Sequence, residues 1–332
     1  MRDLKVDTLR AVAILSILLA HSGVKYFIFN LRSFDVPIMA FCLGISYYYS
    51  SKNISYFNYI KKRIIRLLLP TFLFLIILFD LFYIIDFLLN IPYQFDFNYI
   101  IHSFYMDTSY GYGWIMRTFF LICLIIPFFY KLGEKVSKVQ SMILIFFFLI
   151  VIQYFLIRLG SFIPKDSQYY YEQILLIPFG YCPIVFLGII AKKINVKNGI
   201  KISFIMFFSL IISLYSYGFS GFNTFKYPPE APYIFYGTMC SIVLWLLTQL
   251  FEFKNPKVIN SIVFLSKNSQ KIYFVHVFYI FIYEFYLSNT FQILNKWEFN
   301  YIYLLLTTLL TVFIINNIKI SKINDKIFDK SG

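Results

Sequence analysis

The chain has 332 residues, of which 60% are hydrophobic and only 14% are charged. This balance excludes an ordinary soluble domain, because apolar runs long enough to cross a bilayer recur from end to end. The formal net charge of +14 would suit a nucleic-acid-binding protein, but the basic residues lie in short loops between apolar runs, as the positive-inside rule expects. The partner that these features indicate is the lipid bilayer, and no nucleic acid is expected.

The apolar runs predict an all-α polytopic membrane protein with about ten transmembrane helices. The first run lacks a small-residue cleavage site and is followed by further spans, so a cleaved signal peptide is not expected. We expect one membrane-embedded domain over residues 1–332, with no appended soluble domain. In chain order, the expected spans are 8–28, 35–50, 66–89, 112–130, 141–159, 173–191, 201–218, 232–251, 271–289 and 299–318.

Lysines and arginines are unequally distributed between the two sides of this arrangement. With the N-terminus in the cytoplasm, the cytoplasmic side receives 23 of the 30 basic residues and the outer side receives six, while Arg117 lies within a span. Basic residues are enriched in cytoplasmic loops. The distribution therefore predicts an even number of spans, with both termini in the cytoplasm.

Arg10 and His21 are the most informative polar residues of the first span. Eleven residues at about 100° each make about three whole turns, so both side chains point the same way from one helix, roughly 16 Å apart along its axis. A charge within a span is costly and usually faces a bundle interior or a wet cavity. A histidine at this depth could accept a proton from a hydroxyl. We expect His21 and Arg10 to be catalytic; the alternative for His21 is a core histidine bonded to a backbone carbonyl.

A basic cluster, Lys61-Lys62-Arg63-Ile64-Ile65-Arg66, precedes the third span. Lys62 and Arg66 are four residues apart and share a helix face. Together with Arg10 they would form a cationic mouth on the cytoplasmic side, which suits phosphate groups. Ordinary positive-inside anchoring explains part of the cluster and remains the alternative.

Further candidates for substrate binding lie near other span ends. Tyr273 and His276 are three residues apart and face one way from the ninth span. Lys226 precedes two prolines that fix an extended approach to the eighth span. Trp114 and Arg117 begin the fourth span near the outer interface, where tryptophan is also a common belt residue. Helix packing and interfacial anchoring are the alternatives to a site role.

Arg117 lies deeper in its span than Trp114 and needs a partner, for which Asp107 or Glu230 could serve. The four cysteines fall within apolar runs without paired spacing, which is typical of buried, inert thiols. The chain carries no nucleotide-binding glycine loop, zinc spacing, serine nucleophile motif or two-metal carboxylate cluster. We therefore expect no metal site.

In chain order, several of these motifs resemble those of the acyltransferase-3 family of membrane proteins. An Arg, ten residues and then a His mark the first span of that family, and Arg10 and His21 match them. Lys62 and Arg66 resemble its Arg-three-residues-Arg motif with Lys substituted, and Tyr273 and His276 resemble a late Tyr-x-x-His.

Three further segments are similar to the family but depart from it in detail. The run from Val36-Pro37 to Ser46 is similar to a Pro-leading run that ends in Ser-Gly, although Tyr47 replaces the glycine. Trp114 with Pro127 resembles a Trp-x-Leu…Pro helix, with Met116 in place of leucine. The segment Lys226-Tyr227-Pro228-Pro229 is similar to one branch of the family.

The resemblance implies an inner-membrane O-acyltransferase, usually an O-acetyltransferase. Such an enzyme moves an acyl group from acetyl-CoA, or another acyl-CoA, to a hydroxyl of a cell-surface glycan or its lipid-linked sugar precursor. It holds no tightly bound cofactor; the acyl-CoA is a donor substrate. The CoA phosphates would lie near Arg10, Lys62 and Arg66, and the acceptor would enter near Trp114 and Lys226.

Two other classes of function stay open at this stage. A transporter or flippase for a glycan or lipid would also use intramembrane cations, but it would not require an imidazole eleven residues from a cytoplasmic arginine. A non-enzymatic membrane partner or sensor would tolerate the loss of His21. The histidine therefore separates the three classes.

Overall fold

The computed structural model describes residues 3–50, 54–108 and 110–318. Within these ranges the chain is helical, with 81% of residues in helices and no strand. This confirms the all-α prediction. Some residues in the charge count lie outside the described ranges, namely Arg2, Lys52, Lys319, Lys322, Lys326 and Lys330.

Eight helical segments in the described part of the chain are long and apolar enough to cross a membrane. They correspond to eight of the ten predicted spans. The eight segments are Tyr26–Tyr49, Tyr56–Leu89, Trp114–Lys135, Val139–Gly160, Lys165–Ile189, Val196–Tyr217, Ala231–Leu250 and Trp297–Asn317.

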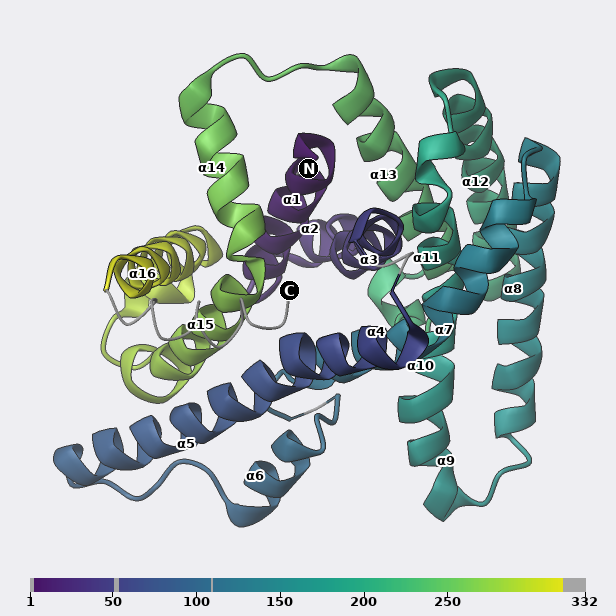
Figure 1. Cartoon of the computed structure of the whole chain (residues 1–332). Helices are drawn as coiled ribbons and strands as arrows, with labels where there is room; N and C mark the ends of the chain where they lie inside the picture. Colours follow the sequence, from purple (N-terminus) through teal and green to yellow (C-terminus); the bar gives the residue numbers. More distant parts are fainter. Residues whose placement is uncertain (1–2, 51–53, 109, 319–332) are drawn as a thin grey trace.

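The two remaining predicted spans are shorter helices. They are α1 (Leu4–Ala20) and α15 (Ser269–Ile282), the latter continued by a π-helical turn over Tyr283–Leu287. Helix α1 contacts α3 (Asp35–Ser50), α13 (Ala231–Leu250), α14 (Pro256–Lys267) and α15. Because neighbouring helices surround it, α1 does not need the length of a lipid-facing span. Figure 1 shows α1 between α14 and α3.

The prediction for the end of the first span, at residue 28, is wrong. Helix α1 ends at Ala20, and a tight turn follows in which Gly23 has a φ of +74°. Glycine adopts this left-handed conformation without steric penalty. The chain then forms the short helix α2 (Tyr26–Leu31) before it enters α3. As a result His21 lies at the end of α1, next to a loop, rather than within a continuous helix.

Two long segments contain a π-helical turn that ends two residues before a proline. Ile64–Leu68 joins α4 (Tyr56–Arg63) to α5 (Leu69–Leu89), and Pro70 follows. Glu172–Leu176 likewise joins α9 (Lys165–Tyr171) to α10 (Ile177–Gly180), and Pro178 follows. Proline has no N–H to donate, and its ring clashes with the carbonyl four residues earlier. The wider π turn avoids that clash and lets the segment continue.

Helices α3 and α11 (Cys182–Ile189) form a close backbone contact at the centre of the bundle. A Cβ atom at Gly44 would lie 2.3 Å from the carbonyl oxygen of Val185, and one at Gly188 would lie 2.2 Å from that of Phe41. Every residue of α11 is buried. Small residues permit such close approach between membrane helices, and this contact fixes α3, which lines both cavities described below.

The other helices surround this centre (Figure 1). Helices α5, α8 and α12 and the last helix are mostly exposed along their apolar faces, as expected for helices that face lipid. Their bounds, with those of the remaining helices, are α6 (Phe97–Phe104), α7 (Trp114–Lys135), α8 (Val139–Gly160), α12 (Val196–Tyr217) and α16 (Trp297–Asn317), and 3₁₀ turns cover Ala191–Lys193, Phe222–Phe225 and Gln292–Asn295.

Candidate active site

One stripe of α1 lines two neighbouring cavities. Arg10, Ile14 and Ile17 border the first, of about 190 Å³, and Ile17, Ala20 and His21 border the second, of about 380 Å³. We call these the Arg10 cavity and the His21 cavity. Residues 10, 14, 17 and 21 follow the helical repeat, so the expectation that Arg10 and His21 face the same way holds in the structure.

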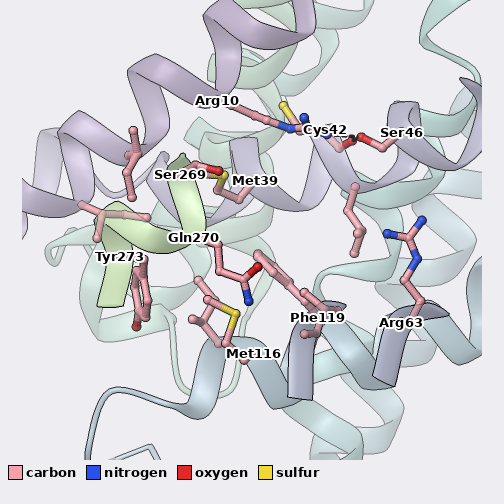
Figure 2. A pocket seen from close by; sticks show the side chains of 15 residues that line it. Arg10, Met39, Cys42, Ser46, Arg63, Met116, Phe119, Ser269, Gln270 and Tyr273 are labelled. Carbon is pink, nitrogen blue, oxygen red and sulfur yellow. Dashed lines mark hydrogen bonds between the residues drawn. The ribbon is translucent and has the colours of Figure 1, made fainter. Parts of the chain in front are cut away.

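The Arg10 cavity is a site of positive charge. The Arg10 guanidinium donates a hydrogen bond to the Ser46 hydroxyl, which itself donates to the Cys42 carbonyl over 2.5 Å. Arg63 supplies the second cation from the opposite wall, with its guanidinium carbon 4.9 Å from the centre of the Tyr59 ring. Figure 2 shows both arginines around the cavity. Among the described lining residues there is no carboxylate, so the cavity suits an anion.

The structure selects a different residue of the basic cluster from the two that were expected. Arg63 lines the Arg10 cavity, whereas Lys62 and Arg66 do not, and Arg66 is exposed. Arg63 and Leu67, four residues apart across the π turn at Ile64–Leu68, line the cavity together. The face that carries Arg63, and not the one that carries Lys62 and Arg66, is therefore turned to the cavity. Lys62, on α4, and Arg66, in the π turn, are each adjacent in sequence to a residue that lines the cavity, Arg63 and Leu67 respectively.

At the edge of the His21 cavity, the His21 ring lies beside the rings of Tyr112 and His276. The centre of the His21 ring is 5.0 Å from that of Tyr112, which meets it edge-on, and 5.3 Å from that of His276. His276 is fully buried and its ring centre is 5.1 Å from that of Tyr273. The structure thus brings together His21, Tyr273 and His276, which sequence analysis named separately from two distant spans.

Hydrogen bonds fix the orientation of the second imidazole. Nδ1 of His276 contacts the backbone carbonyl of Tyr273, and since a carbonyl can only accept, Nδ1 carries the proton and Nε2 keeps its lone pair. The Tyr273 hydroxyl donates to the carbonyl of Tyr112 over 2.6 Å. This bond supports Tyr112 at a φ of +58°, a conformation that is uncommon for a bulky residue and is found mainly where surrounding contacts impose it.

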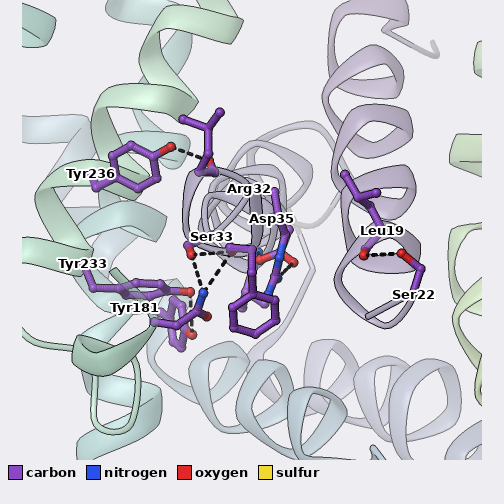
Figure 3. Close-up of polar contacts among 12 residues, drawn as sticks. Leu19, Ser22, Arg32, Ser33, Asp35, Tyr181, Tyr233 and Tyr236 are labelled. Carbon is purple, nitrogen blue, oxygen red and sulfur yellow. Dashed lines mark hydrogen bonds and ion pairs between the residues drawn. The ribbon is translucent and has the colours of Figure 1, made fainter. Parts of the chain in front are cut away.

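Charged residues complete the His21 cavity. Arg32 and Asp35, at the α2–α3 corner, form a buried ion pair of 2.6 Å, which Figure 3 shows between α1 and α13. Lys226 is buried, with its ammonium nitrogen 5.4 Å from the ring centre of Trp114 and 5.2 Å from that of Tyr227. Burial, partly opposed by the nearby Asp35 carboxylate and reinforced by Arg32, lowers the pKa of Lys226 to about 8. A cation–π contact contributes about 0.5–2 kcal/mol, which offsets only part of the several kcal/mol that burial of an unpaired charge costs.

A thin wall separates the two cavities. Ile17 of α1, Ile115 of α7 and Tyr273 of α15 border both of them. Arg10 and His21 therefore face different cavities along one stripe of α1. Arg10 lines its cavity together with Arg63, whereas the His21 ring lies beside that of His276.

Arg117 lies outside both cavities, in a polar network that joins α7 to the loop before it. Its guanidinium donates to Asp107 over 3.0 Å, to the carbonyl of Tyr105 over 3.1 Å and to the side chain of Gln173. The second carboxylate oxygen of Asp107 bonds His102 over 2.8 Å. Asp107, one of the two partners considered from sequence, is thus the acid that pairs with Arg117, and the contacts favour a structural role over substrate binding.

Sequence reasoning did not identify Arg32, Asp35, Arg63 or Tyr112 as site residues. Arg32 and Asp35 carry one weak signal, since both are charged at the start of a span and are spaced for an ion pair. Tyr112 carries none, because its contact with His21 depends on a loop conformation. Among the described residues there is no group of three or more His, Cys, Asp or Glu side chains that could hold a metal ion.

The structure is a multi-pass helical bundle in which two neighbouring imidazoles lie beside a cationic cavity. The family model described as "Acyltransferase domain" matches residues 3–316, so the chain belongs to the acyltransferase-3 family and is a membrane acyltransferase. No curated protein and no solved structure matches the chain significantly.

Proposed function

We propose that the protein transfers an acyl group, in the simplest case acetyl, from acyl-CoA to a hydroxyl of a cell-surface glycan or of its lipid-linked sugar precursor. The observation that carries the proposal is the pair of cavities with one shared wall. The Arg10 cavity offers cations to a donor, and the His21 cavity offers a base to an acceptor. A wall one side chain thick, at Ile17, Ile115 and Tyr273, is the place where donor and acceptor would meet.

The donor side is too small to enclose the whole of acyl-CoA. Small-molecule sites usually measure roughly 300–1,000 Å³, whereas the Arg10 cavity measures about 190 Å³. We expect the acyl end to enter it while the nucleotide end stays outside. The phosphates would then meet cations around the entrance, Arg10 and Arg63 from the lining and Lys62 and Arg66 from the adjoining α4 and π turn.

The proposed reaction uses His21 as general base. A ring nitrogen of His21 takes the proton of the acceptor hydroxyl while the hydroxyl oxygen attacks the thioester carbonyl carbon. The tetrahedral intermediate collapses, the carbon–sulfur bond breaks, and the departing CoA sulfur receives the proton from His21. The products are an O-acyl sugar and free CoA, and His21 returns to its neutral form. His276 packs against the base and positions it.

The proposal also assigns the two cavities to opposite sides of an inner membrane, with both termini in the cytoplasm. The Lys and Arg distribution supports this orientation. Single cysteines at Asn98 and Lys135, both exposed, test it in a variant that lacks the four native cysteines. A membrane-impermeant thiol reagent should label position 98 in intact cells and position 135 only after the membrane is opened. Labelling of position 135 in intact cells would contradict the orientation.

Acyl transfer itself is tested with purified protein in lipid nanodiscs. Acyl-CoA carrying a labelled acyl group is incubated with a membrane glycolipid fraction, and both CoA release and labelled glycan are measured. Mass spectra of surface glycans from cells with and without the protein then identify the modified sugar. If the protein releases no CoA and no glycan gains mass, the proposal is wrong. If it moves a glycan across vesicle membranes without any acyl donor, it is a transporter instead.

A further inference from the structure

The ammonium group of Lys226 is buried in the His21 cavity without an opposite charge bonded to it. Only 7% of the Lys226 surface is exposed. Its described contacts are the faces of Trp114 and Tyr227. Among the described residues no carboxylate forms an ion pair with it. Aromatic faces replace only part of the hydration that a buried ammonium has lost.

Among the described lining residues Asp35 is the one carboxylate, and both of its oxygens already accept hydrogen bonds. One oxygen of Asp35 accepts from Arg32 over 2.6 Å, and the other accepts from the backbone N–H of Val36 over 2.7 Å. The described lining therefore holds two cations, Arg32 and Lys226, and one anion, Asp35. With His21 neutral, the cavity has an excess positive charge located on Lys226.

Hydrogen bonds hold the loop that carries Lys226 in place, so the ammonium group stays in the cavity. Asn223 donates from its side chain to the carbonyl of Phe29 over 3.0 Å and to the hydroxyl of Ser33 over 2.7 Å. Its backbone N–H donates to the side chain of Asn30 over 3.1 Å. These bonds join the loop to the α2–α3 corner that also holds Asp35. The ammonium is thus preorganised for a ligand.

We propose that the His21 cavity binds an acceptor sugar that carries a carboxylate or phosphate group, and that Lys226 recognises this anionic group while His21 faces the hydroxyl to be acylated. The inference rests on the proposed function and names its acceptor class. The cavity, at about 380 Å³, falls within the range of about 300–1,000 Å³ typical of small-molecule sites. Trp114 and Tyr227 provide aromatic faces beside the ammonium, on which the ring of a sugar can pack.

The first experiment compares matched acceptors with one acyl donor. Methyl glucuronide, methyl glucoside 6-phosphate and methyl glucoside share a ring but differ in charge, and the first two distinguish carboxylate from phosphate. We expect the protein to prefer at least one acidic sugar over the neutral one in kcat/KM. Lys226→Met keeps the apolar stem without the charge, and should lower that preference by about 10- to 100-fold, the worth of a charge-assisted hydrogen bond. Lys226→Arg should retain most of it.

Lys25→Met is the matched control, because Lys25 is an exposed lysine at the start of α2. Its removal should leave the preference unchanged. A wild-type protein that prefers the neutral sugar would overturn the proposal. So would a Lys226→Met protein that loses the same factor on all three sugars, because that pattern belongs to stabilisation of the reaction rather than to recognition of the acceptor.

The second experiment measures binding without turnover. His21→Ala protein in nanodiscs is heated with each sugar at equal ionic strength, and its unfolding temperature is recorded. The favoured acidic sugar should raise the unfolding temperature, the neutral sugar should raise it less, and Lys226→Met in the same background should abolish the difference. If this difference is seen but the wild-type protein transfers no acyl group, the proposed function fails while the anion site stands. If transfer occurs without any difference in binding, the anion site fails alone.

Discussion

The Arg10 cavity and the His21 cavity share a wall but hold their charges in different ways. In the first, Arg10 is bonded to a serine hydroxyl and Arg63 lies over a tyrosine ring, and the described lining contains no acid. In the second, Asp35 and Arg32 form an ion pair, and the buried Lys226 remains in the same lining as His21. The first arrangement suits a multiply charged group that stays at an entrance. The second suits a smaller ligand that enters and reacts.

The largest effect should come from the base in the His21 cavity. We expect His21→Ala to reach the membrane at normal abundance and to lose at least about 10²-fold in acyl transfer, the lower end for removal of a general base. His21→Gln should fail too, because an amide keeps hydrogen bonding but cannot take the proton. The measurement is CoA release at saturating donor. Normal turnover in both variants would contradict the role of His21 as general base, and with it the assignment of the chemistry to the His21 cavity.

The second effect should fall on the donor alone. Arg63→Ala should raise the KM for acyl-CoA by about tenfold, the size expected for one charge-assisted contact to phosphate, while the acceptor KM stays nearly constant. Arg66→Ala should raise it less, because Arg66 is exposed and lies outside the cavity. Lys61→Ala is the control for loss of positive charge near the membrane, because Lys61 is also exposed, and it should leave the KM for acyl-CoA nearly unchanged. A larger effect at Arg66 than at Arg63 would mean that the phosphates bind to the surface and not to the cavity.

The third prediction concerns pH and the His21 cavity alone. Lys226 has a pKa of about 8 in the free protein, and an anion binds its protonated form. A bound anion therefore raises this pKa, so affinity for an acidic sugar should be constant below about pH 7 and should fall as pH rises above about 8. The slope should approach a factor of ten per pH unit for one proton. The measurement is the Kd for the acidic sugar from pH 6.5 to 9.5 in His21→Ala protein.

Other titratable or charged groups line the same cavity, and their effect on the pH dependence must be distinguished from that of Lys226. They are Arg32 and Asp35 of the corner, and the hydroxyls of Tyr227 and Tyr273. All four remain in a protein that carries both His21→Ala and Lys226→Met. The residual affinity of that double variant should not follow the same curve. An identical fall in the double variant would assign the titration to one of these groups instead of Lys226.

The smallest effect should appear at the wall and should act on both sides. Tyr273→Phe removes the hydroxyl that donates to the carbonyl of Tyr112 and leaves a buried acceptor unpaired, at a cost of about 1–3 kcal/mol in stability. Since Tyr273 borders both cavities, the KM values for donor and acceptor should change together by a few-fold. Thermal unfolding and the two KM values are the measurements. A change in one KM only would show that the residue belongs to one cavity.

The sequence predicted the spans well because apolar runs set their position directly. The fourth span was expected at 112–130 and the structure has α7 at Trp114–Lys135; the eighth was expected at 232–251 and α13 covers Ala231–Leu250. The first span was less accurate, since a left-handed glycine ends α1 early although the residues beyond it stay partly apolar. Hydropathy measures transfer to lipid, and a helix enclosed by other helices need not follow it.

The site was predictable within a single helix, and not where it depends on how separate elements pack. Arg10 and His21 lie on one stripe because α1 is regular as far as Ala20. Arg63 was missed because the basic cluster places cations on several faces of the chain, and which face lines the cavity depends on how α4 packs. Arg32 and Asp35 were missed because their meaning depends on a third residue, Lys226, which is nearly two hundred residues away and reaches them only in the folded chain.

The shared wall also has a consequence for the insulation of the membrane. With the two cavities open to opposite sides, as proposed, most of the electrical potential across the bilayer falls over Ile17, Ile115 and Tyr273. A potential of 100 mV drives each elementary charge with about 2.3 kcal/mol, and an open path at this point would let protons pass down that gradient. The residues that bring two substrates together must therefore also act as a seal. If these side chains move apart during the reaction, the acyl group or the sugar must fill the space between them, because otherwise the protein would conduct protons.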